Sequence, residues 1–214
     1  MHDSSDTFFD AASQGLRENY RLLIGSVVPR PIAWVSTLSE KAVANLAPYS
    51  FFTVASCEPP VLCVVQIAPR NAREKDTLRN LRATRECVVN IVSADLAARM
   101  NLCSGDYPPE VSEFDLAQLT QSPSRLVRVP GVAEARVRIE CRLREVVLIS
   151  SGPGGGALML LDVLGFHVQS GLLESGAILP QALDAVGKMG DDAYAFTRDR
   201  FDLARPPSDR PLQG

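Results

Sequence analysis

The sequence predicts a mainly β protein in which short strands, interrupted by a few short helices, close into a barrel. The clearest sign is a stretch where apolar and charged residues alternate, which predicts a long strand with one buried face and one wet face. Its apolar members are Ala135, Val137, Ile139, Cys141 and Leu143. A glycine-rich loop at 152–156 then reverses the chain, and 157–169 is predicted to return as the antiparallel partner. Short strands that end in a long antiparallel hairpin favour a barrel over a βαβ sheet.

The first elements of the chain are a helix and two strands. Residues 17–24 have the pattern of a short amphipathic helix, which Gly25 is expected to close before Pro29. Two strands are predicted at about 31–37 and 46–55, joined by a polar turn.

The middle of the chain alternates strands and helices after the dipeptide Pro59-Pro60, which breaks the second strand. The predicted elements are an almost continuously apolar, central strand at 61–68, a helix at 75–83, a strand at 86–93 and a short helix at 94–102. Asp76 is the expected N-cap of the helix at 75–83. The polar region that follows the helix at 94–102, to about residue 130, is predicted to be loop with one helical turn.

Composition indicates a soluble globular protein of one domain over residues 1–214. The net charge is −3 with acidic and basic residues interspersed, so neither a nucleic-acid surface nor a polybasic membrane patch is expected. No linker or internal repeat divides the 214 residues. The core is expected at about 17–200, and the tail from about 205 is expected to be disordered or wrapped on a partner.

The cysteines and the N-terminus favour a cytoplasmic location. Five cysteines are scattered without a C-x-x-C pair, which indicates reduced thiols. The first residues are acidic and lack the basic and apolar regions of a signal peptide, and no apolar run approaches the roughly 20 residues that span a bilayer.

Scarcity of histidine disfavours metal-dependent and histidine-assisted chemistry. The chain has only His2 and His167, without the clustered spacing of a metal site, so no metal is expected. The same scarcity disfavours a Ser-His-Asp or Cys-His nucleophile, and no catalytic acid, base or nucleophile is assigned.

Two patterns admit a ligand-binding interpretation, and the simpler structural interpretation is favoured for both. The loop at 152–156 lacks the Gly-Lys-Ser/Thr of a phosphate loop, so we interpret it as a hairpin tip. The arginines of the long hairpin could attract a phosphorylated cofactor such as NADPH. Arginine alternating with apolar residues is more often the solvated face of a half-buried strand, and that is the interpretation adopted.

Small polar residues gather where the first two strands end. The first strand leads to Ser36 and Thr37, and the second carries Asn45, Ala47, Pro48 and Ser50. A strand edge lined by small residues allows backbone N–H groups to approach a flat, polar, anionic ligand. These features suit a flavin nucleotide.

The predicted helix start at Lys75 and Thr77 is a second candidate for ligand binding. Free N–H groups and the positive end of the helix dipole favour an anion there, and Lys75 adds a full charge. Alone this signal is weak, and it gains weight from the strand edges described above.

Taken together, these segments resemble the flavin reductase-like family of FMN-binding split-barrel proteins, over about residues 17–200. The segments are 29–37 (PRPIAWVST), 45–52 (NLAPYSFF), 59–60 (PP), 75–80 (KDTLRN), 86–90 (ECVVN) and 187–194 (GKMGDDAY). Lys188 stands where the family usually has arginine, which replaces a bidentate phosphate fork by a point charge. The turn at 39–42 lacks the glycine that is often found there.

The resemblance implies a Greek-key split β-barrel that forms a homodimer and holds FMN near the subunit interface. Ser36, Thr37 and Lys75, with Thr77, are then the candidates for the phosphate and ribityl groups. Asn45, Ala47, Pro48 and Ser50 would line the edge of the flavin ring, and Lys188 and Tyr194 would complete the site. A partner monooxygenase or electron-transfer protein is also implied.

The leading hypothesis is an NAD(P)H-dependent flavin reductase that uses FMN, with NADH or NADPH as the electron donor. The hydride chemistry belongs to the cofactor, which accounts for the missing acid, base and nucleophile. One alternative is a flavoprotein electron carrier that does not use NAD(P)H directly. The other is a non-enzymatic split-barrel protein that binds a different planar ligand.

Overall fold

Seven strands form one antiparallel sheet in the order β3-β2-β6-β9-β10-β5-β4. In the computed structural model, which describes residues 6–69 and 74–206, these strands are β2 (Ala33–Leu38), β3 (Ala44–Tyr49), β4 (Phe52–Cys57), β5 (Pro60–Ile67), β6 (Glu86–Ile91), β9 (Val137–Leu148) and β10 (Gly156–Val168). The mainly β architecture predicted from the sequence is confirmed.

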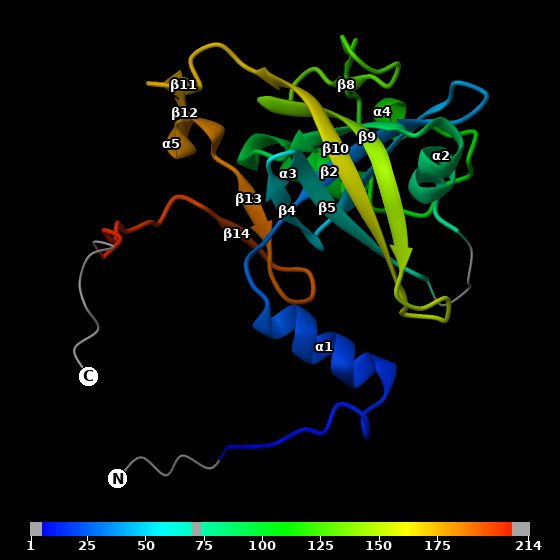
Figure 1. The fold of residues 1–214 in the computed structure, drawn as a ribbon, viewed down its shortest axis with the longest axis vertical. Coiled ribbons are helices and arrows are strands. Elements are labelled where there is room, and N and C mark those ends of the chain that lie inside the picture. The colour runs from blue at the N-terminus through cyan, green and yellow to red at the C-terminus, as the bar shows by residue number, and fades with distance from the viewer. Residues whose placement is uncertain (1–5, 70–73, 207–214) are drawn as a thin grey trace.

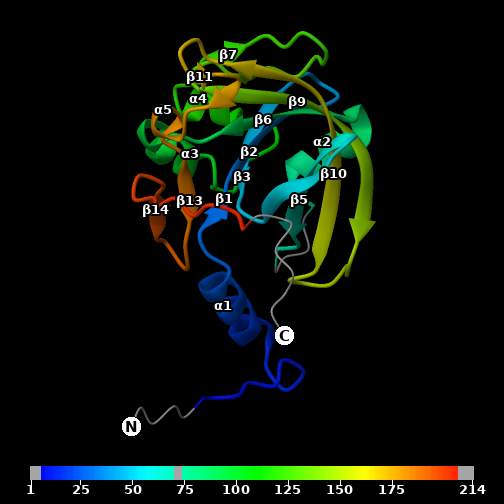
Figure 2. The same ribbon diagram turned by 60° about the vertical axis from the view of Figure 1, so that its left-hand side comes forward.

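The two edges of this sheet are joined by only two residues, so the sheet curls into a barrel (Figures 1 and 2). Edge strand β3 ends at Tyr49, and the opposite edge strand β4 begins at Phe52. The N–H of Val65 in β5 donates to the carbonyl of Phe51 at 2.8 Å, which ties this link to the sheet. The single strand expected at 46–55 is therefore wrong: it is divided at Ser50, because the chain passes there from one edge of the sheet to the other.

The two larger of the three hydrophobic clusters lie on opposite faces of the sheet. The first fills the barrel and includes Val35, Val64, Val89 and Met159. The second packs Trp34, Leu46 and Phe114 between the outer face of the sheet and the helices η1 (Ala94–Leu96), α3 (Ala97–Leu102) and α4 (Glu113–Leu116). Strand β2 contributes to both cores, so both of its faces are buried. The predicted helical turn in the loop region corresponds to α4.

The helix α2 (Asp76–Thr84) packs Leu78 and Leu81 against the core inside the barrel. Its N-cap is Lys75 rather than the predicted Asp76. Asp76 is instead the first helical residue, and its carboxylate forms an ion pair with the Arg79 guanidinium at 2.6 Å. An aspartate at this position is stabilised by the helix dipole without acting as the cap.

The helix α1 (Leu16–Ser26) lies outside the barrel, below the sheet in the view of Figure 1. It runs through Gly25, which was expected to close it, because the N–H of Val27 still donates to the carbonyl of Leu23 at 3.0 Å. Gly154 at the hairpin tip approaches its first turn: a Cβ there would lie 2.3 Å from Leu16 Cδ1. The interpretation of this glycine-rich loop as a hairpin tip is confirmed.

A buried arginine joins α1 to the C-terminal part of the chain. The guanidinium of Arg30 donates to the carbonyls of Ile24, Val27 and Met189 at 2.7, 2.8 and 2.9 Å. Arg30 lies in β1 (Arg30–Pro31), which forms a small sheet with β13 (Val186–Lys188) and β14 (Tyr194–Phe196). The remaining short elements are β7 (Gln121–Ser122), β8 (Gly131–Val132), β11 (Leu173–Glu174), β12 (Ala177–Ile178) and α5 (Pro180–Leu183).

The alternation in β9 is confirmed for its apolar face, and one charged residue departs from it. Glu140, predicted on the wet face, is 1% exposed. Its carboxylate accepts N–H groups of the loop at 125–127, which covers this part of the strand. None of the helices in the two described ranges is long and apolar enough to cross a bilayer. The expected tail from about 205 falls mostly on 207–214, outside the described residues.

Candidate functional site

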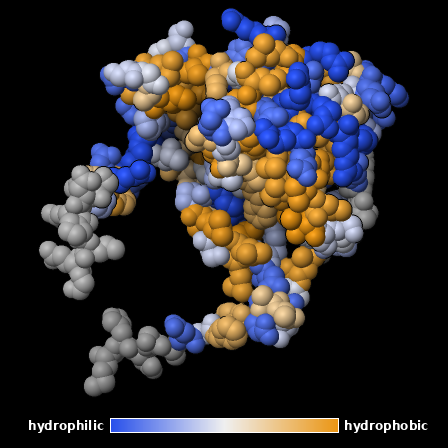
Figure 3. Space-filling model, in the orientation of Figure 1, coloured by the Kyte–Doolittle hydropathy of each residue, from blue (hydrophilic) through white to orange (hydrophobic). Residues whose placement is uncertain are grey.

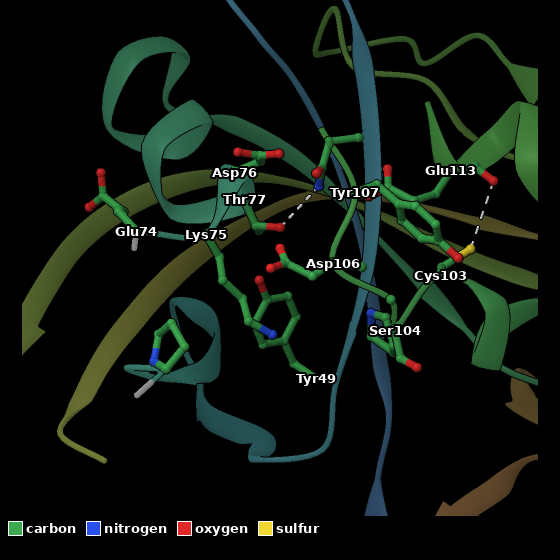
Figure 4. Close-up of a pocket in the computed structure, with 15 residues that line it drawn as sticks. Tyr49, Glu74, Lys75, Asp76, Thr77, Cys103, Ser104, Asp106, Tyr107 and Glu113 are labelled. Carbon is green, nitrogen blue, oxygen red and sulfur yellow. Dashed lines mark hydrogen bonds between the residues drawn. The ribbon is translucent and has the colours of Figure 1, made fainter. Parts of the chain in front are cut away.

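Two adjoining cavities contain most of the residues predicted to bind a ligand. The first, of about 230 Å³, is enclosed by β3, the start of α2 and the loop between α3 and α4 (Figure 4). The second, of about 320 Å³, lies between the end of β3, helix α3 and the β13–β14 hairpin. Pro48 and Ser104 line both cavities, so together they form one elongated site.

The polar wall of the first cavity joins β3 to α2. Asn45 Nδ2 donates to Thr77 Oγ1 at 3.0 Å, and both side chains are buried. This bond ties the edge strand β3 to the first turn of α2.

Lys75 is the one cationic side chain that lines the first cavity within the described residues. It stands at the N-cap of the nine-residue helix α2. Its Nζ lies 5.9 Å from the centre of the Tyr49 ring, and Figure 4 shows the lysine extending alongside that ring. The neighbouring carboxylates of Glu74 and Asp76 are paired with arginines outside the cavity, which reduces their repulsion of an anion.

Burial raises the pKa of three titratable groups that line this cavity. It raises the pKa of the Tyr49 phenol and raises that of the Cys103 thiol to about 12. Burial also raises the pKa of Glu113, whose carboxylate accepts the N–H of Leu46 at 2.9 Å. A thiol protonated at neutral pH is a poor nucleophile.

The second cavity is bordered by a lysine and a tyrosine from the β13–β14 hairpin. Lys188 Nζ lies 4.3 Å from the centre of the Tyr194 ring and donates to the carbonyls of Asp191 and Ala193. Burial lowers the pKa of Lys188. The Tyr194 hydroxyl donates to Asn101 Oδ1 at 3.1 Å, which connects the hairpin to α3.

Eight of the ten predicted residues line these cavities. Asn45, Ala47, Pro48, Lys75 and Thr77 line the first cavity, and Pro48, Ser50, Lys188 and Tyr194 line the second.

The structure does not bring Ser36 and Thr37 to either cavity. Both residues are fully buried because β2 is an interior strand with both faces covered. Ser36 Oγ donates to the carbonyl of Pro130 at 2.6 Å, and Thr37 Oγ1 accepts a hydrogen bond from Asn80 Nδ2 at 3.1 Å. Their hydroxyls hold the barrel together rather than facing a ligand.

Several lining residues were not singled out from the sequence. Tyr49 lies within the segment NLAPYSFF and could have been chosen from its position between Pro48 and Ser50. The loop at 103–107 and Glu113 carry no local signal, since only the packing of α3 and α4 against β3 brings them to the cavity. Within the described residues no group of three or more His, Cys, Asp or Glu could hold a metal ion.

Comparison with known proteins identifies the family. The sequence profile of the flavin reductase-like domain matches residues 24–190, which is most of the chain. The chain belongs to the flavin reductase-like family. An uncharacterized member from Halalkalibacterium halodurans is 39% identical over 192 residues, covering 89% of this chain and 92% of the relative.

Solved structures agree with this family and with its fold. Nitrilotriacetate monooxygenase component B from Bacillus cereus is 33% identical, with a TM-score of 0.88 over 93% of this chain and 99% of that one. A protein from Shewanella frigidimarina, described as a flavin reductase with a split barrel domain, has a TM-score of 0.79 at 21% identity, covering 94% and 99%. The predicted split-barrel fold of this flavin reductase-like chain is thereby confirmed.

Proposed function

We propose that this flavin reductase-like protein holds FMN in the two adjoining cavities and reduces it with NADH or NADPH. The observation that carries the proposal is the elongated site itself. Its end at α2 suits a phosphate, while its middle and far end are bordered by Pro48, Ser50 and Tyr194, which suit a flat ring.

The donor set supports phosphate binding at α2. Lys75 supplies a charge, Thr77 supplies a hydroxyl, and the first turn of the helix supplies free N–H groups. Bound FMN would supply the hydride and electron chemistry. Asn45, Ala47, Pro48 and Ser50 would position the ring edge, and Lys188 and Tyr194 would close the opposite side.

A spectroscopic experiment separates the proposed reaction from its alternatives. Purified protein titrated with FMN is expected to show the two-band flavin spectrum shifted from that of free FMN. Anaerobic addition of NADH or NADPH is then expected to bleach it. Bleaching by dithionite but by neither nicotinamide would instead favour an electron carrier, and a protein that binds no flavin would contradict the proposal altogether.

Replacing Lys75 by alanine is expected to weaken FMN far more than riboflavin. A charge-assisted contact to the phosphate contributes about 1.5–3 kcal/mol, so the dissociation constant of FMN should rise roughly tenfold to a hundredfold. Riboflavin lacks the phosphate and should bind both proteins alike. Fluorescence titration measures both ligands.

The matched control for this experiment is Lys41→Ala, which removes an exposed lysine from the turn between β2 and β3. It should leave both affinities unchanged. Equal weakening of FMN and riboflavin by Lys75→Ala would mean that this lysine contacts another part of the ligand.

A homodimer is part of the proposed function, because one stripe of α1 is apolar and exposed (Figure 3). Leu16, Tyr20, Leu23 and Val27 follow helical spacing and are 48%, 46%, 58% and 59% exposed. An apolar helix face of this kind is typically covered by a partner, and a second copy would cover it. Light scattering at micromolar concentration should give the mass of two chains, and a flavin-loaded monomer would contradict this.

The reduced flavin would be consumed by a partner monooxygenase or by an electron-transfer protein. Similarity to component B of a monooxygenase favours the first kind of partner. A cytoplasmic location is proposed because the five cysteines, all of which lie in the described residues, are free thiols.

A further inference from the structure

A third cavity, of about 480 Å³, lies on the β9–β10 hairpin and shares no lining residue with the other two. Arg138 lines it from β9 and Arg136 from the position just before β9. His167 lines it from β10, and Arg125 lines it from the loop that covers the hairpin. In the sequence, Arg136 and Arg138 alternate with apolar residues, as on the solvated face of a strand. Folding brings three arginine residues to the lining of one cavity.

The single carboxylate of this cavity, Glu140, offsets only one of the three arginine charges. It accepts the N–H groups of Arg125, Leu126 and Val127 at 2.7, 2.6 and 3.1 Å, and it is also bonded to His167 Nε2. The carboxylate of Glu140 is therefore held against the backbone of the loop. Counting one negative charge for Glu140 and one for Asp95, which pairs with Arg136, the three arginines still leave a positive excess.

Two of the three guanidiniums are free to bind an anion. Arg136 is engaged, with Asp95 Oδ2 at 3.3 Å and the carbonyl of Ala182 at 2.6 Å. The guanidiniums of Arg138 and Arg125 have no hydrogen bond or ion pair to any other described residue. The stem of Arg138 packs over Gly131, where a Cβ would lie 2.8 Å from Cδ, so its position is restrained.

Glu140 also fixes the geometry of the cavity. Its bond to the N–H of Arg125 holds that residue over β9, while Arg138 stands directly opposite His167 in the β9–β10 ladder. Restrained guanidiniums bind phosphate well because their planar donors match its oxygen atoms in pairs.

We propose that this third cavity binds a small phosphate-bearing molecule, separately from the flavin site. Two free guanidiniums and a third nearby favour a ligand with at least two negative charges, as a phosphate or pyrophosphate group carries, over a monocarboxylate. The cavity volume lies within the range of small-molecule sites. A net charge of −3 for the whole chain makes this local excess of positive charge a specific feature.

Calorimetric titration of the FMN-saturated protein with inorganic pyrophosphate tests the proposal. Saturation with FMN keeps the phosphate end of the flavin site occupied. One molecule should bind per chain, and Arg138→Gln should weaken it about tenfold or more, the effect of losing a charge-assisted contact. Arg142→Gln is the matched control: it removes an exposed arginine of the same strand that does not line the cavity, and should leave the affinity unchanged.

Further measurements distinguish a phosphate ester from free phosphate as the ligand, and distinguish the third cavity from the flavin site. Tighter binding of AMP than of inorganic phosphate would identify the ligand as a nucleotide-like ester, and the reverse order would identify a free inorganic anion. Lys75→Ala protein, whose flavin site is weakened, should bind pyrophosphate as the parent does. No binding of any of these anions, or equal weakening by Arg138→Gln and Arg142→Gln, would overturn the proposal whatever the outcome for FMN.

Discussion

Replacing Ala47 by leucine is expected to abolish FMN binding while the barrel stays folded. Ala47 lines the first cavity from edge strand β3, opposite Val35 in the ladder. A cavity of about 230 Å³ has no room for three additional carbon atoms beside a flavin ring. Leucine is itself tolerated in strands, and Ala47 is only partly buried, so the fold should accept it.

Flavin titration and thermal unfolding of the flavin-free protein measure the two parts of this expectation. The matched control is Ala55→Leu, an exposed position of the neighbouring barrel edge β4 that lines none of the cavities. Ala55→Leu should bind FMN normally. If Ala47→Leu also binds FMN with unchanged affinity, the flavin lies elsewhere and the assignment of β3 is wrong.

The largest loss of stability is expected from Glu140→Gln. Glutamine keeps one acceptor oxygen but places an NH₂ donor against the N–H groups of the loop at 125–127. Losing charge-assisted bonds at a side chain only 1% exposed should cost about 3 kcal/mol of the free energy of unfolding. Urea unfolding at pH 7 measures it, and Glu145→Gln, an exposed position of the same strand, should change it little.

This loss should depend on pH. Burial raises the pKa of Glu140, but the N–H donors and His167 outweigh it, so the pKa in the folded protein is lowered. A lowered carboxylate pKa stabilises the fold above the unfolded-state pKa of about 4.3, and this contribution disappears as the pH falls through the folded-state pKa. The gap between parent and Glu140→Gln should therefore narrow below about pH 4. A gap that widens with acidity would show that Glu140 is not held as a carboxylate.

Patterns of period two and local turn chemistry allowed much of the fold to be predicted. The buried face of β9 and its pairing with β10 follow from strict alternation, since each face of a strand meets one environment. The segment NLAPYSFF and the helix start at Lys75 also pointed to the cavity, because small residues and free N–H groups are local properties of the chain.

The sequence alone determined that this protein is mainly β, and it predicted the small polar residues of β3 that line a cavity. Only the tertiary structure decided which polar residues face a ligand. Ser36 and Thr37 look like site residues in the sequence but are buried on interior strand β2, whereas Glu140 looks solvated but is enclosed by a loop. Arg136 and Arg138 look like part of a wet strand face but line a cavity. The physical reason is the same in each case: burial depends on what packs over a residue from distant parts of the chain.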